Sequence, residues 1–223
     1  MGDPVEQQAF SEAEREAVYR VIAERRDMCH FSGGVVDPAV LARVLEAAHQ
    51  APSVGLMQPW RFLRLTDDDL RRAVHRLVDD ERVRTAEALG ERSDEFMRLK
   101  VDGVLECAEL LVVALSDDRE RHVFGRRTMP HMDLASASCA VQNLWLAARA
   151  EGLGMGWVSL FEPAALGELL GLPEGSEPIA VLCLGPVPAF YPRPMLQEQG
   201  WATARPLSQL LFENSWGVPA AAQ

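Results

Sequence analysis

Hydrophobic residues follow two kinds of pattern along this chain. Alternating or continuous apolar segments predict strands over residues 60–66, 110–115, 154–160 and 179–184. The segment 110–115 is an uninterrupted apolar run bounded by charge, which is typical of a central strand. Helical spacing predicts helices over 13–26, 38–50, 132–151 and 163–170, and a weak one over 206–212. A charged helical region covers 67–106, with a polar interruption at 90–94. Helices around a few strands predict an α+β fold.

Residues at the ends of these segments support the predicted starts and ends of the helices. Asp37 and Pro38 are an N-cap and a first-turn proline for the second helix. Gly152 suits the C-terminal end of the long helix over 132–151. At its start we expect a capping role for Asp133.

The chain has 223 residues, enough for one domain with a sizeable core. We expect a flexible tail over 1–12, a single domain over 13–217 and a disordered tail over 218–223. The domain includes a proline-rich extended arm from residue 187 onward, of the kind that embraces a partner subunit.

Charge and composition exclude several classes of function. The formal net charge of −11 argues against nucleic-acid binding, because phosphates would be repelled. No apolar run approaches 18 residues and no secretory signal is evident, so we expect no membrane span and a cytoplasmic location. The cysteines are too scattered for a zinc site, so we expect no metal and four free, buried thiols: Cys29, Cys107, Cys139 and Cys183.

The end of the first helix carries the sequence Arg25-Arg26-Asp27. Two guanidinium groups offer forked donors to a phosphate, and the neighbouring carboxylate can orient one of them or act as a base. The alternative is a solvated helix end, where the helix dipole favours cations.

A loop of turn-forming residues runs from Pro52 to Pro59. Small and rigid residues expose backbone N–H groups there, and Gln58 adds an amide that both donates and accepts, which suits the edge of a planar heterocycle. A surface turn between a helix and a strand is the alternative.

The segment Gly154-Met155-Gly156-Trp157-Val158-Ser159 combines two glycines with a hydroxyl. The glycines allow close backbone approach to a ligand, and Ser159 supplies a hydrogen-bonding group. The alternative is a plain turn and core strand whose serine bonds to backbone.

Taken together, these strings resemble a known family. Residues 51–60 (APSVGLMQPW), Thr128-Met129-Pro130 with Met132-Asp133-Leu134, and residues 139–159 resemble the 5,6-dimethylbenzimidazole synthases, a flavin-cleaving family within the nitroreductase superfamily. The resemblance extends from about residue 18 to 217, nearly the whole chain.

The resemblance implies a nitroreductase-like fold with a mainly antiparallel sheet, a homodimer with FMN at the interface, and reduced FMN and molecular oxygen as reactants. It implies that Asp27 and Ser159 are the catalytic residues of flavin cleavage. We hypothesise that Asp27 is the base and that Ser159 positions oxygen or the flavin ring. The product would be 5,6-dimethylbenzimidazole, the lower ligand of cobalamin, together with a four-carbon sugar phosphate, and a separate flavin reductase is a possible partner. Flavin-binding positions would be Arg25, Arg26, Asp27, Met28, Cys29, Pro52, Ser53, Val54, Gly55, Met57, Gln58, Trp157, Val158, Ser159 and Arg205.

This chain departs from the family pattern at several positions. Cys29 stands where an arginine is usual, Ala202-Thr203-Ala204 stand where arginines follow Trp201, and Arg205 is close enough to substitute. Two other functions stay open: an NAD(P)H-dependent nitroreductase or flavin reductase, and a non-catalytic flavin-binding protein. The aspartate at position 27, where ordinary nitroreductases usually carry serine, favours flavin cleavage.

Overall fold

The computed structural model describes residues 8–220. They belong to two compact units, one ending at Phe190 and the other beginning at Tyr191. The first unit contains a four-stranded antiparallel sheet in the order β1-β2-β4-β3. Its strands are β1 (Trp60–Leu65), β2 (Glu109–Leu115), β3 (Gly154–Val158) and β4 (Glu177–Gly185). The predicted α+β class and all four predicted strands are confirmed.

Strand β2 is buried along its whole length and pairs with β1 on one side and β4 on the other. This confirms that residues 110–115 form a central strand. Alternate β2 side chains enter two different cores, because successive strand residues point to opposite faces. Leu111 and Val113 belong to one core, and Leu110 and Val112 belong to the other.

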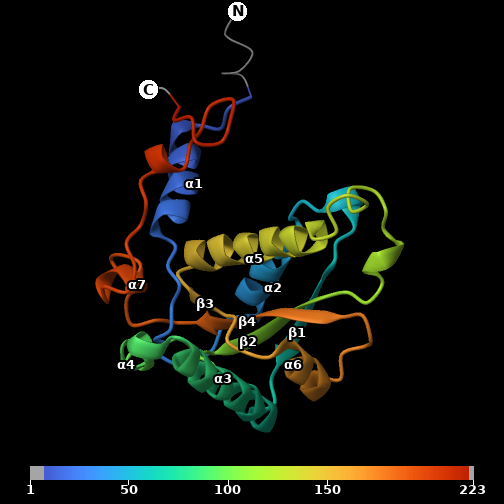
Figure 1. Cartoon of the computed structure of the whole chain (residues 1–223), viewed down its shortest axis with the longest axis vertical. Coiled ribbons are helices and arrows are strands. Elements are labelled where there is room, and N and C mark those ends of the chain that lie inside the picture. Colours follow the sequence, from blue (N-terminus) through green and yellow to red (C-terminus); the bar gives the residue numbers. More distant parts are fainter. Residues whose placement is uncertain (1–7, 221–223) are drawn as a thin grey trace, which may run out of the picture. The chain divides into compact units, whose positions relative to one another are not determined.

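Helices cover each face of the sheet (Figure 1). The first core packs against α2 (Pro38–His49) and α5 (Met132–Ala150), and the second against α3 (Asp68–Ala88) and α6 (Pro163–Leu170). Helix α2 begins as predicted: the Asp37 carboxylate accepts a 2.7 Å hydrogen bond from Ala39 N, and Pro38 occupies the first turn. Helix α5 ends at Ala150, and Gly152 follows with a φ of 77°.

The first helix, α1 (Glu12–Glu24), begins with a capping box between Ser11 and Glu14. None of its residues is buried, and Val18 and Ile22 on its apolar face are 47% and 48% exposed. An amphipathic helix gains most of its stability from packing. The exposed apolar face of α1 therefore suits contact with another protein surface.

The remaining elements are short. The first unit adds η1 (Val54–Leu56), η2 (Gly90–Arg92), α4 (Ser93–Met97) and η3 (Arg119–Arg121). The second unit contains α7 (Met195–Glu198), which the sequence analysis missed, and η4 (Leu207–Gln209), which lies within the predicted weak helix over 206–212.

Three predictions from the sequence were wrong. The charged helical region ends at Met97, not at residue 106, because residues 98–108 turn back toward β2. Asp133 is not the N-cap of α5, which is His131; it lies in the first turn, where its carboxylate accepts a 2.6 Å hydrogen bond from Leu134 N and is buried in an ion-pair cluster with Arg119 and Arg126. Cys139 is exposed, whereas the other three cysteines are buried.

The predicted boundaries of the domain and its tails stay predictions. Residues 1–7 of the expected tail 1–12, and 221–223 of the expected tail 218–223, lie outside the described residues. Among residues 8–220, no helix is long and apolar enough to cross a membrane.

Candidate active site

Residues Asp27 and Met28 lie along the outer edge of β3 as a short parallel bridge. The Met28 amide donates a 2.9 Å hydrogen bond to the Met155 carbonyl. The Asp27 carboxylate accepts a 3.0 Å hydrogen bond from the Trp157 amide. Because both bonds use the backbone of a rigid strand, they fix the position of the Asp27 carboxylate.

Two glycines of β3 make this approach possible. A Cβ on Gly156 would lie 2.3 Å from the Met28 carbonyl oxygen, and a Cβ on Gly154 would lie 3.2–3.3 Å from Met28 side-chain atoms. The glycines therefore admit the chain segment that carries Asp27. The close approach expected here was to a ligand; the structure shows close approach of this protein segment, and the approach of a ligand stays a prediction.

The Asp27 carboxyl has a raised pKa. More than a third of the residue's surface stays open to solvent, yet the protein atoms around the carboxyl displace much of its water. This burial raises the pKa of Asp27 to about 6, against the opposing effects of the Trp157 amide and the Arg25 charge. A carboxylate of this acidity suits proton transfer near neutral pH.

Trp145 of α5 holds the two arginines that precede Asp27. Its indole Nε1 donates a 3.1 Å hydrogen bond to the Arg26 carbonyl. The Arg25 guanidinium carbon lies 4.4 Å from the centre of the Trp145 ring, in a cation–π contact. The Arg26 guanidinium turns back to the carbonyls of Ala23 and Arg25, at 2.7 Å each. Arg25 is thus the better placed of the two to meet an anion.

The side chains of Met28 and Cys29, the next two predicted flavin-binding residues, point into the protein. Met28 is fully buried and Cys29 is 5% exposed, so neither side chain presents a surface to a ligand. Burial and nearby carboxylates raise the pKa of the Cys29 thiol to about 12, and the Lys100 charge opposes them. Cys29 therefore stays a neutral thiol, and Lys100 is a cation close enough to influence it.

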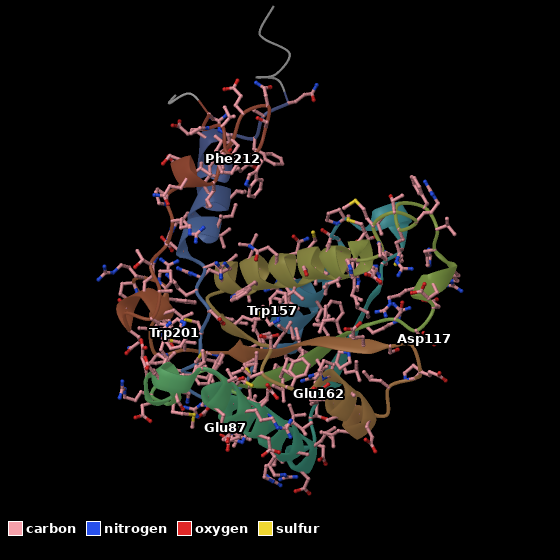
Figure 2. All side chains as sticks on the ribbon, in the orientation of Figure 1. Glu87, Asp117, Trp157, Glu162, Trp201 and Phe212 are labelled. Carbon is pink, nitrogen blue, oxygen red and sulfur yellow. The ribbon has the colours of Figure 1, made fainter. Side chains whose placement is uncertain are left out.

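Trp157, Val158 and Ser159 end strand β3 beside Asp27. Figure 2 shows Trp157 between α5 and the sheet, where its ring centre lies 6.3 Å from that of Trp145. Val158 is buried, while Ser159 is exposed just beyond the strand. Ser159 comes two residues after Trp157, whose amide binds Asp27. In an extended chain this spacing places the two residues about 7 Å apart.

The loop from Pro52 to Gln58 adopts an unusual backbone conformation. Gly55, Leu56 and Gln58 have φ values of 55°, 53° and 49°, a region that residues with side chains rarely occupy. Ser53 Oγ accepts a 3.1 Å hydrogen bond from Gln58 N, and Ser136 Oγ accepts a 3.1 Å hydrogen bond from Val54 N. Of the predicted positions, Pro52 and Gly55 are exposed, Ser53, Val54 and Gln58 half-buried, and Met57 buried.

Within one chain, the predicted site is in two halves. The loop 52–58 is tied to α5 at Ser136, whereas the segment 25–27 is tied to α5 at Trp145. Nine residues of helix separate these anchors, about 13 Å at 1.5 Å per residue. Arg205 is exposed and belongs to the second unit. The structure thus joins Arg25 and Asp27 to Trp157 and Ser159, and leaves loop 52–58 apart from them.

Sequence reasoning missed the residues that support the site. Trp145 and Ser136 were part of a helical pattern whose buried positions were credited to packing alone. A tryptophan or serine on a helix face gives no sign of which distant backbone group it will meet. The Arg126–Asp133 pair was missed for the same reason.

Comparison with known proteins assigns the chain to a family. The model of the nitroreductase family matches residues 22–186. The chain belongs to the nitroreductase family, and its sequence relatives place it with the 5,6-dimethylbenzimidazole synthases. The resemblance seen in the motifs is therefore confirmed.

The chain is 38% identical to the 5,6-dimethylbenzimidazole synthase of Rhodospirillum rubrum over 202 residues, which is 88% of this chain and 94% of that protein. It is 36% identical to the protein of the same name from Rhodobacter capsulatus, over 86% and 94% of the two chains. Its fold is similar to that of iodotyrosine deiodinase bound to FMN and 3-iodo-L-tyrosine, with a TM-score of 0.65 and 24% identity over 79% of this chain and 94% of that one.

Proposed function

We propose that this protein is a 5,6-dimethylbenzimidazole synthase that binds reduced FMN and cleaves it with molecular oxygen. The organic product is the lower ligand of cobalamin, and the second fragment is a four-carbon sugar phosphate. The observation that carries the proposal is the Asp27 carboxylate, held by the Trp157 amide beside Ser159 at the edge of β3. Relatives that cover most of the chain share the synthase name.

Asp27 is the general base in this proposal. Fragmentation of the flavin requires removal of a proton from the ribityl carbon next to the ring. A base for this step has to be ionised near neutral pH and basic enough to accept the proton, and a pKa of about 6 for Asp27 meets both needs. The Trp157 amide stabilises the ionised form and keeps the carboxylate in place.

Ser159 and Arg25 orient the substrate. The Ser159 hydroxyl lies at the open end of β3, where it is free to reach a flavin atom or oxygen. Arg25 offers its guanidinium from the face of the Trp145 ring, which suits the flavin phosphate. Lys100 lies near Cys29, where the family arginine is missing, but its ammonium group is paired with Glu106 at 2.7 Å. Arg25 is therefore the cation on which phosphate binding depends in this proposal.

We further propose that the site is completed by a second copy of the chain. About 13 Å of helix α5 separates the two halves of the predicted site within one chain. A homodimer that brings loop 52–58 of one protomer against Asp27 and Ser159 of its partner unites them. The exposed apolar face of α1 supports such an interface. An interfacial pocket also excludes water, which protects a reactive flavin from side reactions.

The test is incubation of the purified protein with chemically reduced FMN in air, followed by mass spectrometry. We expect one 5,6-dimethylbenzimidazole per flavin consumed. Intact FMN with hydrogen peroxide would contradict the proposal and favour a flavin reductase. Tight binding of reduced FMN without any oxygen-dependent product would favour a flavin-binding protein. Steady oxidation of NAD(P)H with bound, undegraded FMN would favour a nitroreductase.

A further inference from the structure

The loop 53–58 needs external support to keep its shape. Its left-handed backbone at Leu56 and Gln58 is unfavourable for residues with a Cβ, so the surroundings must hold it in place. Leu56 is 80% exposed and contributes little packing of its own. The contacts on the two sides of the loop therefore decide whether it keeps this conformation.

One side is held by α5. Ser136 is 4% exposed, and its hydroxyl receives the Val54 amide at 3.1 Å while donating to the Met132 carbonyl at 2.5 Å. This contact fixes the start of the loop, and the Ser53–Gln58 hydrogen bond closes it.

The other side is held by the segment Phe124-Gly125. A Cβ on Gly125 would lie 2.2 Å from Val54 Cγ2, so the Val54 side chain packs directly against the Gly125 backbone. A Cβ on Gly55 would likewise lie 3.2 Å from the Phe124 ring and 3.4 Å from the Phe124 carbonyl oxygen. Phe124 itself is 83% exposed, so this segment needs an anchor of its own.

Arg126 is that anchor. It is 8% exposed, and its guanidinium contacts the buried Asp133 carboxylate at 3.1 Å, the Arg119 carbonyl at 2.6 Å and the Pro130 carbonyl at 3.2 Å. Its other carboxylate partner, Glu120 at 3.1 Å, is exposed to solvent. Asp133 is 6% exposed, and it also pairs with Arg119 at 3.4 Å. On α5, Asp133 lies three residues before Ser136, so a single turn of the helix supports both sides of the loop.

We propose that Arg126 and Asp133 are positioning residues that hold loop 53–58 in its ligand-binding shape through Phe124 and Gly125. The inference rests on the proposed function of this loop in binding flavin. Both side chains are buried, so we expect them to act through this segment and not by direct contact with the ligand. A buried ion pair is well suited to this task, because an alternative placement of the segment would leave a buried charge unpaired.

The test compares Asp133→Asn with the control Glu109→Gln. Glu109 is 7% exposed and pairs with Arg64 at 2.6 Å between β1 and β2, so this control removes a buried carboxylate whose partner lies in β1 and not in the segment 119–126. The first readout is hydrogen exchange of the Val54 and Gln58 amides in the flavin-free protein. The second is the affinity for reduced FMN, measured without oxygen.

In Asp133→Asn we expect faster exchange of both amides and a loss of affinity of about tenfold or more, because the buried Arg126 and Arg119 guanidinium groups lose the carboxylate that pairs with them. Glu109→Gln should change neither. Unchanged loop exchange in Asp133→Asn would overturn the inference. Faster exchange with unchanged affinity would show that the loop does not bind flavin. The product assay on the unmodified protein tests the proposed function separately, so the two failures can be told apart.

A second variant covers the case in which Asp133→Asn does not fold. Gly125→Ala leaves the ion pair intact but places a methyl group against Val54, at a position where φ is 78°. The same increase in loop exchange and the same loss of affinity are expected, with Gly167→Ala in α6 as its control. A Gly125→Ala protein with normal loop exchange would count against the inference.

Discussion

The Asp27 carboxylate accepts a 3.0 Å hydrogen bond from the Trp157 amide, although 130 residues separate the two in sequence. This bond ties the end of α1 to the edge of the sheet. It also stabilises the ionised carboxylate in surroundings that otherwise favour the neutral acid. The hydrogen bond therefore fixes the position of the proposed base, whereas burial of the carboxyl raises its pKa against the effect of that bond.

Replacement of Asp27 by Asn tests the base directly. Asparagine keeps an oxygen that can accept the Trp157 hydrogen bond, so the fold and flavin binding should be retained. Product formation from reduced FMN should fall by about 100-fold or more, the usual contribution of a general base. Quantitation of 5,6-dimethylbenzimidazole checks the loss, and undiminished product would rule out Asp27 as the base.

The rate of flavin cleavage should depend on the ionisation of Asp27. Since a base must be deprotonated to act, the single-turnover rate should rise with pH and level off above the pKa of about 6. The reaction is followed by flavin absorbance after rapid mixing with oxygen. A profile that stays flat between pH 5 and 7, a range centred on that pKa of about 6, would contradict the assignment.

The raised pKa of Asp27 also predicts how the free energy of unfolding changes with pH. The folded pKa of Asp27 lies above its ordinary value of 3.8, so the folded protein binds more protons between the two values. The contribution of Asp27 to stability is fully present below about pH 4 and is lost as pH rises through about 6. Comparison of unfolding of the native chain and Asp27→Asn across this range measures it.

Replacement of Gly156 by Ala should displace the segment that carries Asp27. The added methyl group would lie 2.3 Å from the Met28 carbonyl oxygen, a backbone atom that can move only with the chain segment around Asp27. We expect a destabilisation of about 1–3 kcal/mol from overpacking, together with loss of product. Gly167→Ala is the matched control, because a methyl group there meets its nearest neighbours at an ordinary 3.9 Å.

Two substitutions of Trp145 separate its two contacts. Trp145→Phe keeps a ring under Arg25 but removes the N–H that binds the Arg26 carbonyl, at a cost of about 1 kcal/mol. Trp145→Leu removes both and should weaken FMN binding further. Flavin titration measures the affinities, and equal affinities for the two variants would exclude a role for the cation–π contact.

The proposed homodimer can be tested through α1. The double substitution Val18→Asp and Ile22→Asp places charge on its exposed apolar face and should shift the protein to monomers in analytical ultracentrifugation. Product formation should be lost with the dimer, because each monomer carries a divided site. Val83→Asp on α3 is the control, since Val83 is 45% exposed there. A dimer that survives the double substitution would place the interface elsewhere.

The sequence by itself determined the elements and the family. The apolar run at 110–115, the Asp37-Pro38 helix start and the helix over Pro163–Leu170 depend on local patterns of burial and capping, and the structure has them as expected. The strings around Ser53 and Ser159 were long enough to indicate the family, which the comparisons confirm.

The tertiary structure alone decided how those residues meet. Local periodicity could not reveal that Gly156 admits the Met28 backbone, that Trp145 holds Arg25 and Arg26, or that Asp133 forms a buried pair with Arg126. Each of these contacts joins residues from different segments, and its energy depends on distances and burial that exist only once the chain has folded. The raised pKa of Asp27 has the same cause, because burial is a property of the surroundings and not of the residue.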